Sequence, residues 1–508
     1  MEITPDPSWP HPLPGSGHDA VSHLRATPPA SIFRAYDVRG EVAGPMDVDA
    51  SLLTTFGANV LGRAFGTALE RQGIATVAVG HDSRAYAPGL AGALIEGLLS
   101  TGREVVVLGL ATTPMVYFAQ HHLEVAAAVA VTASHNPNGW AGFKLSTAPS
   151  TTLGPDGIAE LRELADAGTF ARGRGTYVER SVTDDYIQDL AARSPAPAPL
   201  KVVVDGGNGV AGPIAAASFA AAGHEVVPIN LELDWRFPAH EPDPEVLAAR
   251  RQLAAAVEAH GADLGVAFDG DGDRLGVSDE RGETVYADRL VALLARDVLA
   301  RHPGSTILYD VKCSRLVGDV VRAAGGHPVM GRTGHSHIKQ QMQALGAPFA
   351  GERSGHIFDG VDHLGFDDAV HAGLRLAAVL ARADGSLSAL VDALPAYRSS
   401  PTMQAPCPDA AKDAAVERIA ERLLRLADPE EVVRVDGIRL EFADGWLLVR
   451  ASSNMPGLVV LCEAKDEAGL LGYYRLLRAA IDPDAEVGGT WLNDTLAEAA
   501  AATGGGGA

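Results

Sequence analysis

Cysteine is scarce in this sequence, whose 508 residues include only Cys313, Cys407 and Cys462. The three lie far apart and form no Cys-x-x-Cys pair, so neither a disulfide framework nor a zinc site is expected. Apolar runs are also short, and none reaches the roughly 18 residues that span a bilayer. The Pro-rich segment 1–29 lacks the apolar core of a signal peptide. We therefore expect a cytoplasmic protein that does not enter a membrane.

Basic residues are in the minority: 41 lysines and arginines stand against 64 aspartates and glutamates, and the net charge is −23. This balance argues against sequence-independent binding to nucleic acid, which needs a basic field. It is compatible with a small anionic substrate, because nearby lysines and arginines outweigh distant acids at physiological salt. The content of 47% hydrophobic and 21% charged residues is typical of a soluble globular protein with several domains.

Short β-branched runs alternate with Ala- and Leu-rich stretches over most of the chain. This alternation predicts β-α-β units, parallel sheets and an α/β fold. The expected strands include 75–79, 104–108, 127–131, 201–204, 225–229, 264–267 and 306–309. The expected helices include 51–72, 89–100, 211–222 and 290–301.

The pattern changes in the last part of the chain. Two long helical stretches, 410–426 and 467–480, flank an expected hairpin around Gly445, which indicates a separate, smaller α+β domain. We therefore predict four domains, at 30–181, 182–283, 284–395 and 396–484, with flexible extensions at 1–29 and 485–508. Candidate linkers are 172–183, 279–284 and 396–408.

A hydroxyl nucleophile stands beside a histidine in the run Thr132-Ala133-Ser134-His135-Asn136-Pro137. If the apolar run 127–131 is a buried parallel strand, Ser134 lies at its carboxyl end, where open α/β sheets bind ligands. His135 and Lys144 would then neutralise the charge of a phosphoryl group attached to Ser134. The alternative is an ordinary turn, because Asn and Pro favour turns.

Three carboxylates alternate with glycines in the run Asp269-Gly270-Asp271-Gly272-Asp273-Arg274. The glycines allow a tight loop in which the carboxylates converge on one cation, and oxygen ligands in small number suit Mg²⁺. A calcium EF-hand is disfavoured, because Arg274 occupies the position that this loop reserves for glycine and because the flanks look like strands. The remaining alternative is a plain acidic turn.

Two further runs offer polar groups to a sugar phosphate. Glu352, Ser354 and His356 alternate along the chain, so an extended loop would present them on one side to sugar hydroxyls. The second run follows the expected strand 446–449 and offers a phosphate a guanidinium, two hydroxyls and an amide, from Arg450, Ser452, Ser453 and Asn454. The alternatives are a solvated polar loop and an ordinary turn.

Two motifs point to other enzyme classes. The run 207–212 has the spacing of a dinucleotide fingerprint, and Glu232 follows the next strand. We favour a tight strand–helix turn there, because a nicotinamide site would leave the serine and aspartate runs unexplained. The run 336–339 matches the Ser-x-x-Lys of penicillin-binding enzymes, but its partner motif would have to precede it at 332–334, in the wrong order.

Seven runs occur in the order of one known family, at 32–40, 132–137, 202–212, 269–274, 310–313, 333–336 and 351–356. On these runs the chain resembles the α-D-phosphohexomutase superfamily over about residues 30–480, and is most similar to its bacterial phosphomannomutase/phosphoglucomutase members. The resemblance implies three similar α/β domains with mixed sheets and a smaller fourth domain, arranged around a central cleft.

The resemblance also implies a role for each candidate residue. Ser134 would be phosphorylated, and one of its phosphoryl oxygens would complete an Mg²⁺ site formed by Asp269, Asp271 and Asp273. The residues that serve the transferring phosphoryl group would be His135, Lys144, Arg274 and His356. Sugar contacts would come from Lys312, His335, Glu352, Ser354 and His356. The distal phosphate would bind to Arg450, Ser452, Ser453 and Asn454. The cleft would be lined by Tyr36 and Arg39.

The implied reaction interconverts hexose 6-phosphate and hexose 1-phosphate, of mannose or glucose or both, with glucose or mannose 1,6-bisphosphate as intermediate and activator. Two departures bear on the substrate range. Trp140-Ala141-Gly142-Phe143-Lys144 stands where members often have Tyr-Asn-Gly-x-Lys, and Asn454 replaces a threonine of the phosphate loop. The alternatives are a phosphoglucosamine mutase, an NAD(P)-dependent oxidoreductase and a non-catalytic sugar-phosphate binder. The sequence does not decide between a monomer and a dimer.

Overall fold

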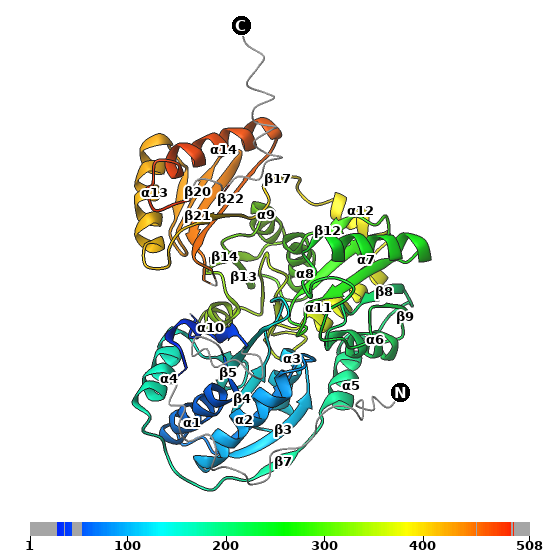
Figure 1. Cartoon of the computed structure of the whole chain (residues 1–508). Coiled ribbons are helices and arrows are strands. Elements are labelled where there is room, and N and C mark those ends of the chain that lie inside the picture. Colours follow the sequence, from blue (N-terminus) through cyan, green and yellow to red (C-terminus); the bar gives the residue numbers. More distant parts are fainter. Residues whose placement is uncertain (1–27, 35, 43–52, 454, 489–490, 492–508) are drawn as a thin grey trace.

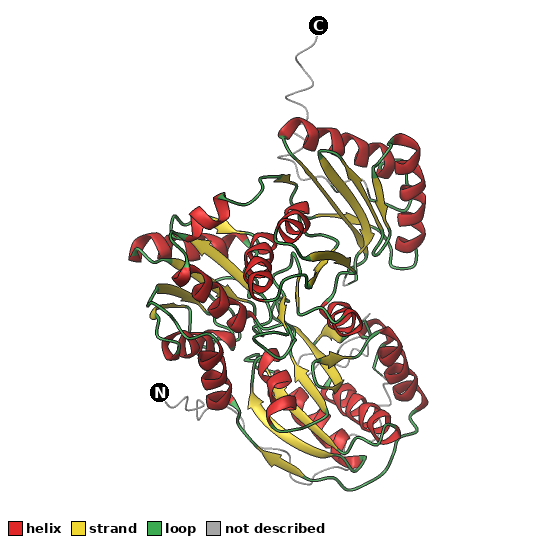
Figure 2. Ribbon diagram, turned by 180° about the vertical axis from the view of Figure 1, so that it is seen from behind, coloured by secondary structure: helices red, strands yellow, loops and turns green. Residues whose placement is uncertain are grey.

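The computed structural model of the chain describes residues 28–34, 36–42, 53–453, 455–488 and 491. Four β-sheets follow one another along the chain, and each sheet forms one structural unit with its helices. In Figure 1 the first sheet lies at the bottom in blue and cyan, the second at the right in green, and the fourth at the top in orange. Viewed from behind, the strands are flanked by helices (Figure 2). No helix among the described residues is long and apolar enough to cross a membrane.

The first sheet is mixed, with the order β1-β5-β4-β2-β3-β7 and β6 beside β5. Its strands are β1 (Val38–Glu41), β2 (Thr76–His81), β3 (Glu104–Leu110), β4 (Ala127–Val131), β5 (Trp140–Ala148), β6 (Thr151–Thr152) and β7 (Tyr177–Glu179). Its helices are η1 (Ala30–Ile32, a single 3₁₀ turn), α1 (Thr55–Arg71), α2 (Ala87–Ser100), α3 (Thr113–His122) and α4 (Pro155–Ala167).

Strand β4 shows why these residues form a central strand. All five of its Ala and Val side chains are buried, as expected of a parallel strand covered on both faces. Alternate residues enter different cores: Val129 packs with α1, α2 and α4, while Ala128 packs on the other face with α3. The predicted strand 127–131 is therefore confirmed, and its carboxyl end lies between two helical layers.

The second sheet has the order β12-β11-β10-β8-β9. Its strands are β8 (Lys201–Asp205), β9 (Glu225–Ile229), β10 (Leu264–Phe268), β11 (Leu275–Asp279) and β12 (Thr284–Val285), and its helices are α5 (Thr183–Arg193), α6 (Ala211–Ala221) and α7 (Leu247–His260). Strands β11 and β12 pair antiparallel. The linker predicted at 279–284 is therefore wrong: this segment is a hairpin turn, in which the Asp279 carboxylate accepts hydrogen bonds from the backbone of Arg281 and Glu283.

The third sheet has the order β14-β13-β15-β16. Its strands are β13 (Thr306–Asp310), β14 (His327–Gly331), β15 (Phe349–Gly351) and β16 (Ile357–Asp359). Its helices are α8 (Ala287–Arg301), α9 (Arg315–Ala323), α10 (His335–Leu345), α11 (Ala369–Arg382) and α12 (Leu387–Asp392). Helix α11 packs against α8 and also against α5, α6 and β10. One apolar core is therefore continuous from α3 through the second sheet to the third.

The fourth sheet is antiparallel, with the order β17-β22-β21-β20-β19 and β18 beside β22. Its elements are β17 (Arg398–Ser399), β18 (Met403–Pro406), α13 (Lys412–Leu426), β19 (Glu431–Val433), β20 (Ile438–Phe442), β21 (Gly445–Ala451), β22 (Gly457–Ala464) and α14 (Glu467–Ile481). The predicted hairpin is confirmed as β20–β21. Both helices cover one face of this sheet, and the other face packs on Val311 of the third unit.

The C-terminal extension predicted to be flexible from residue 485 differs at its start. Gly488 donates a backbone hydrogen bond to Pro406 at 2.8 Å, and Trp491 is 5% exposed within the core beneath α13 and α14. The indole nitrogen of Trp491 donates to Asp482. Burial of this large apolar ring holds the segment to the fourth sheet. The remainder of both predicted extensions lies largely outside the described residues, and the limits of the four domains stay a prediction.

Candidate active site

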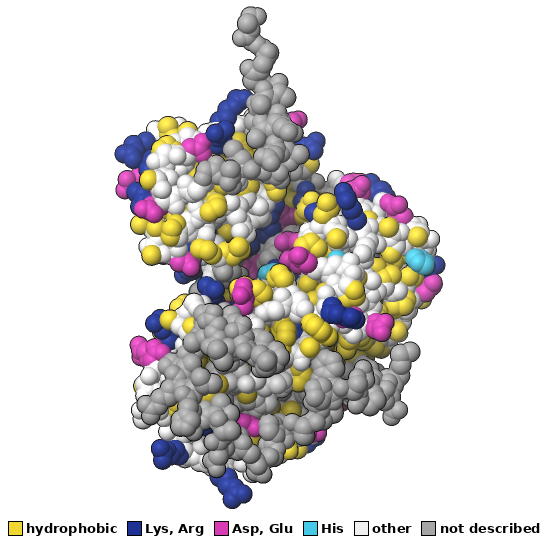
Figure 3. All heavy atoms as spheres, viewed as in Figure 1, with side chains coloured by type: hydrophobic (Ala, Val, Ile, Leu, Met, Phe, Trp, Pro, Cys, Tyr) yellow, Lys and Arg dark blue, Asp and Glu magenta, His cyan; other side chains and the backbone are white. Residues whose placement is uncertain are grey.

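The polar motifs gather where central strands of three different sheets end. Ser134 follows β4, Asp269 follows β10 and Glu352 follows β15, which is the edge at which open α/β sheets bind ligands. Figure 3 shows a hollow between the fourth unit and the remainder of the molecule, with Lys or Arg, Asp or Glu and His side chains inside it. This hollow corresponds to the predicted central cleft.

Ser134 occupies a strained, tightly held turn. Its φ of 51° places a non-glycine residue in the left-handed region, a conformation that proteins maintain where the surrounding structure enforces it. Its backbone N–H donates to Thr132 Oγ1 at 2.8 Å, and its side chain points to the aspartate loop. A Cβ on Gly270 would lie 2.6 Å from the Ser134 carbonyl oxygen. Glycine at position 270 is therefore what allows the two loops to touch.

Arg84 holds the serine loop in place, although it was not among the predicted site residues. Its guanidinium donates to the carbonyls of Ser134 at 2.9 Å, Asn136 at 2.6 Å and Pro137 at 3.1 Å. Its Nε donates to Asp82 at 3.2 Å, and both charged residues are buried. The signal was the position of Asp82 and Arg84 just after β2, which lies beside β4 in the same sheet.

Asp269 links the serine to the aspartate loop. Its Oδ1 accepts hydrogen bonds from the backbone N–H groups of Gly272, Asp273 and Arg274, each at 3.1 Å. Its Oδ2 accepts a hydrogen bond from Ser134 Oγ at 2.8 Å. Burial raises the pKa of the Asp269 carboxyl well above its ordinary value, and the neighbouring Asp273 and Asp271 raise it further. The carboxyl next to the serine hydroxyl therefore binds a proton more readily than an ordinary aspartate does.

Lys144 is the cation that the protein itself places among these acids. Its Nζ donates to Asp271 Oδ2 at 2.8 Å and to Asp273 Oδ2. Burial opposes the charge of Lys144, but Asp271 and Asp273 outweigh burial and raise its pKa well above the ordinary value. Burial also favours the neutral form of Asp273, yet Lys144 and His356 hold its pKa well below the usual range. Charged carboxylates and a charged ammonium thus stand together.

The three aspartates fit a hard metal ion. One oxygen of each lies within 4.8 Å of the others, and all three side chains are fully buried. Asp271 Oδ1 is buried without a hydrogen-bond partner in the described part of the chain, although such atoms ordinarily have one. An oxygen-only donor set with an unsatisfied carboxylate oxygen is the chemistry that hard divalent cations require. The chain therefore has a candidate acidic metal site.

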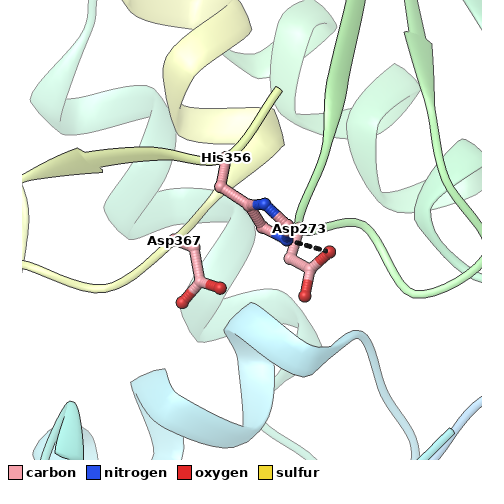
Figure 4. Close-up of side chains that lie close together, drawn as sticks. All are labelled: Asp273, His356 and Asp367. Carbon is pink, nitrogen blue, oxygen red and sulfur yellow. Dashed lines mark ion pairs between the residues drawn. The ribbon is translucent and has the colours of Figure 1, made fainter. Parts of the chain in front are cut away.

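His356 connects the aspartate loop to the sugar loop. Its Nε2 lies 3.3 Å from Asp273 Oδ1, and its Nδ1 lies 3.1 Å from Glu352 and 2.9 Å from Ser354 Oγ. Burial alone would lower the pKa of His356, but Asp273 and Glu352 raise it to about 9, so the ring is a cation at neutral pH. Figure 4 shows the His356 ring facing Asp273, with Asp367 on the other side.

Behind His356 the predicted residues His335 and Tyr36 meet two residues outside the predicted site, Lys339 and Asp367. The His335 and His356 rings stack with centroids 5.9 Å apart, and His335 Nδ1 lies 3.7 Å from Asp367. Asp367 in turn accepts a hydrogen bond from Lys339 at 3.0 Å. Burial and the nearby Lys339 hold the pKa of His335 well below its ordinary value, so its ring is neutral. The Tyr36 and His335 rings pack edge to face with centroids 5.2 Å apart, which places Tyr36 at this cleft.

Asp436 connects the sugar loop with the predicted phosphate loop. Its Oδ2 accepts hydrogen bonds from Arg450 Nε at 2.7 Å and from the Thr333 N–H at 3.1 Å. The next residue, Gly334, donates its N–H to Glu352 Oε1 at 2.6 Å. Arg450 also donates to Ser453 Oγ at 3.0 Å. A continuous set of contacts therefore runs from Arg450 through Glu352 and His356 to the aspartate loop.

The remaining predicted residues are arranged as follows. Arg39 donates to Asn136 Oδ1 at 2.8 Å and so holds the serine loop, as Arg84 does. Lys312 Nζ lies 3.4 Å from Asp310, and Arg439 fixes this segment by donating to the carbonyls on either side of Lys312. Ser452 accepts a hydrogen bond from Lys412 through its carbonyl. Asn454 lies outside the described residues.

The role of His135 in neutralising phosphoryl charge stays a prediction. The Nδ1 atom of His135 lies 3.1 Å from Ser134 Oγ. Burial lowers the pKa of His135 well below its ordinary value, and Arg274 and Arg39 lower it further. Beside the unmodified Ser134 hydroxyl the ring is therefore neutral and lies at hydrogen-bond distance. Arg274 is the cation here, because Asp243 and Asp269 raise its pKa although burial opposes its charge.

The glycines of the run 207–212 serve packing. A Cβ on Gly207 would lie 3.0 Å from the His240 ring, and that ring is bonded to Asp205 at 3.1 Å. A Cβ on Gly209 would lie 3.2 Å from the backbone of Gly270. A histidine and a carboxylate thus occupy the turn where a pyrophosphate would approach, and the glycines let this turn support the aspartate loop.

Comparison with known proteins identifies the family. The models described as phosphoglucomutase/phosphomannomutase alpha/beta/alpha domains I, II and III match residues 30–172, 184–282 and 286–397, and the C-terminal domain model matches 403–473. The chain belongs to the phosphoglucomutase/phosphomannomutase family. The predicted superfamily, four-domain fold class and hexose-phosphate mutase activity are confirmed, and an oxidoreductase is excluded.

Individual relatives agree with this assignment. The chain is 41% identical to the phosphomannomutase/phosphoglucomutase of Pseudomonas aeruginosa over 446 residues, which is 87% of this chain and 94% of the relative. It is 36% identical to the phosphoglucomutase of Neisseria gonorrhoeae over 456 residues, covering 89% and 96%. The crystal structure of a phosphoglucomutase/phosphomannomutase family protein from Burkholderia thailandensis has a TM-score of 0.82 and 38% identity, covering 90% of this chain and 99% of that one.

Proposed function

We propose that this mutase acts on both mannose and glucose phosphates through a phosphorylated Ser134 and a hexose 1,6-bisphosphate. The observation that carries the proposal is the hydrogen bond of 2.8 Å between Ser134 Oγ and Asp269, in a loop of three buried carboxylates. A hydroxyl in such a place is suited to carry a phosphoryl group beside a divalent cation. The relatives from Pseudomonas, named for both sugars, support dual specificity.

The first half-reaction moves the phosphoryl group from the enzyme to the sugar. The bond between Ser134 Oγ and phosphorus breaks while a bond forms between phosphorus and the oxygen of the free sugar hydroxyl. The proton of that hydroxyl ends on Ser134 Oγ, where Asp269 and His135 lie within hydrogen-bond distance. Lys144, Arg274 and the protonated His356 stabilise the charge of the transferring group.

The second half-reaction uses the same atoms with the sugar reversed. The bisphosphate turns in the cleft, Ser134 Oγ attacks the other phosphorus, and the proton of Ser134 ends on the released sugar oxygen. Arg450 with Ser452, Ser453 and Asn454 binds whichever phosphate is not reacting, and the contacts from Arg450 through Asp436 and Thr333 to Glu352 support a common frame for both orientations. Glu352, Ser354, His335 and Lys312 contact the sugar, and Tyr36 and Arg39 line its entrance.

In this proposal Asp269, Asp271 and Asp273 would hold Mg²⁺ together with an oxygen of the phosphoryl group on Ser134. When bound, the ion withdraws charge from the phosphoryl group and so makes it a better electrophile. Glucose or mannose 1,6-bisphosphate serves as the activator that phosphorylates Ser134. The protein is a cytoplasmic monomer or dimer without nucleic-acid or membrane partners, which is consistent with its acidic charge and short apolar runs.

The substrate assignment is tested by coupled assays with mannose 1-phosphate, glucose 1-phosphate and glucosamine 1-phosphate, each with its own bisphosphate. We expect similar kcat/KM values for the first two and a clearly lower value for the third, because a C2 ammonium would meet the protonated His356. Highest efficiency with glucosamine 1-phosphate would overturn the assignment in favour of a phosphoglucosamine mutase.

A further inference from the structure

Thr113, in the first turn of α3, bonds to the aspartate loop across 158 positions of the sequence. Its Oγ1 donates to Asp271 Oδ2 at 2.6 Å, and its backbone N–H donates to the main-chain carbonyl of Asp271 at 2.9 Å. Both residues are buried, at 1% and 0% exposure. A threonine of the first unit therefore holds both the side chain and the backbone of an acid of the second unit.

These contacts give the two oxygens of the Asp271 carboxylate different surroundings. Oδ2 accepts from Thr113 and from Lys144 Nζ, at 2.6 and 2.8 Å. Oδ1 is buried and has no hydrogen-bond partner within the described residues. Two donors on one oxygen prevent rotation of the carboxylate, so the other oxygen stays directed to the point where the three aspartates converge.

The local fold leaves little freedom for this arrangement to relax. Thr112 caps α3 by accepting from the Met115 N–H at 3.1 Å, which leaves the Thr113 N–H, at the helix start, to bond outward. A Cβ on Gly272 would lie 3.2 Å from the Thr112 side chain and 3.0 Å from Ala211. The helix start and the loop are therefore in close contact, and the loop cannot withdraw without losing that packing.

We propose that Thr113 is a positioning residue of the metal site, which aligns Asp271 for the cation and makes metal affinity depend on contact between the first two units. The inference rests on the proposed function, because it assumes that Asp271 binds Mg²⁺. Groups that orient metal ligands without touching the metal typically change affinity by about ten- to a hundredfold when removed. We expect a loss of this size when the Thr113 hydroxyl is removed.

The test uses Thr113→Val, which keeps the side-chain shape and the backbone N–H but removes the hydroxyl donor. Mg²⁺ alone is titrated calorimetrically into the full-length, metal-stripped protein, and the Mg²⁺ dependence of kcat/KM is measured in parallel. The valine variant should bind Mg²⁺ about ten- to a hundredfold more weakly, while its kcat at saturating Mg²⁺ stays near the wild-type value. Thr113→Ser, which keeps the hydroxyl, should restore the affinity.

The matched control is Thr67→Val in α1, which also removes a buried hydroxyl, one that donates to the Arg63 carbonyl at 2.7 Å. It should leave the Mg²⁺ affinity unchanged. If the Thr113→Val protein does not fold, Thr113→Ala is titrated in the same way, since alanine introduces no extra methyl contact. Wild-type affinity in the folded Thr113 variant would overturn the inference. Failure of the wild-type protein itself to bind Mg²⁺ would instead overturn the proposed function.

Discussion

Replacement of Lys144 by methionine should destabilise the metal-free protein strongly and the Mg²⁺-loaded protein much less. The Lys144 side chain is 4% exposed and contacts Asp271 and Asp273, both fully buried. Removing one partner of such a buried pair leaves charge without compensation, at a cost of about 3–5 kcal/mol in the free energy of unfolding. For a cooperative unit of 150–250 residues this corresponds to a fall in Tm of roughly 6–20 °C.

The assay is urea and thermal unfolding of wild type and Lys144→Met, each in EDTA and in saturating Mg²⁺. Because a divalent cation at the three aspartates supplies the missing positive charge, the difference in the free energy of unfolding between wild type and Lys144→Met should be smaller in Mg²⁺. The control is Lys201→Met: this lysine pairs with Glu225 at 3.2 Å, but both side chains are at least a third exposed. Its removal should cost only about 0–1 kcal/mol with or without Mg²⁺.

The reasoning would be refuted if Lys144→Met and Lys201→Met lost equal stability in EDTA. The reasoning would also fail if Mg²⁺ left the stability lost in Lys144→Met unchanged, since the cation would then not be bound among these carboxylates. Activity of Lys144→Met should stay low even in saturating Mg²⁺, because the lysine also stabilises the transferring phosphoryl group in the proposed mechanism.

Two further predictions concern the sugar and phosphate loops. Arg450→Ala should raise KM about tenfold to a hundredfold with a smaller change in kcat, because a charge-assisted hydrogen bond to the non-reacting phosphate contributes about 1.5–3 kcal/mol; steady-state kinetics that give an unchanged KM would count against this role. In EDTA, the stability contributed by protonated His356 should be complete below pH 6.5 and disappear as pH rises through about 9, because its folded-state pKa exceeds the ordinary 6.5. The loss in the free energy of unfolding is at most about 3 kcal/mol. Urea unfolding from about pH 6 to about pH 10 measures this loss. A His356→Gln protein with the same pH dependence would contradict the prediction.

Local motifs carried most of the correct sequence predictions. The turn at Ser134 and the loop of Asp269, Asp271 and Asp273 are contiguous runs that each follow a buried strand, and Gly270 and Gly272 allow the tight turn of the second run. The shared site of Ser134 and the three aspartates was implied by the resemblance to the phosphohexomutases, and the rule that ligand sites form at the carboxyl ends of parallel strands placed only Ser134. For such elements the information lies within a few residues, and sequence reasoning can therefore find it.

Contacts between segments far apart in the sequence could not be predicted from local motifs. Thr113 meets Asp271 only because two separate units pack together. Lys339 meets Asp367 through the folding of the third unit, and neither contact follows from spacing along the chain. The segment 279–284 was mistaken for a linker because polar residues with glycine are common both in linkers and in hairpin turns. The neutral state of His135 depends on burial and on Arg39 and Arg274, neither of which its own motif reveals.

The central claim is that Ser134 carries the phosphoryl group, and intact-mass spectrometry tests it most directly. Wild type and Ser134→Ala are each incubated with glucose 1,6-bisphosphate and Mg²⁺, freed of small molecules and weighed, and turnover is measured on the same samples. The account predicts one added phosphate on the wild type, none on the variant, and a loss of turnover of several orders of magnitude with the fold retained. A phosphate on the Ser134→Ala protein together with near-normal turnover would contradict it.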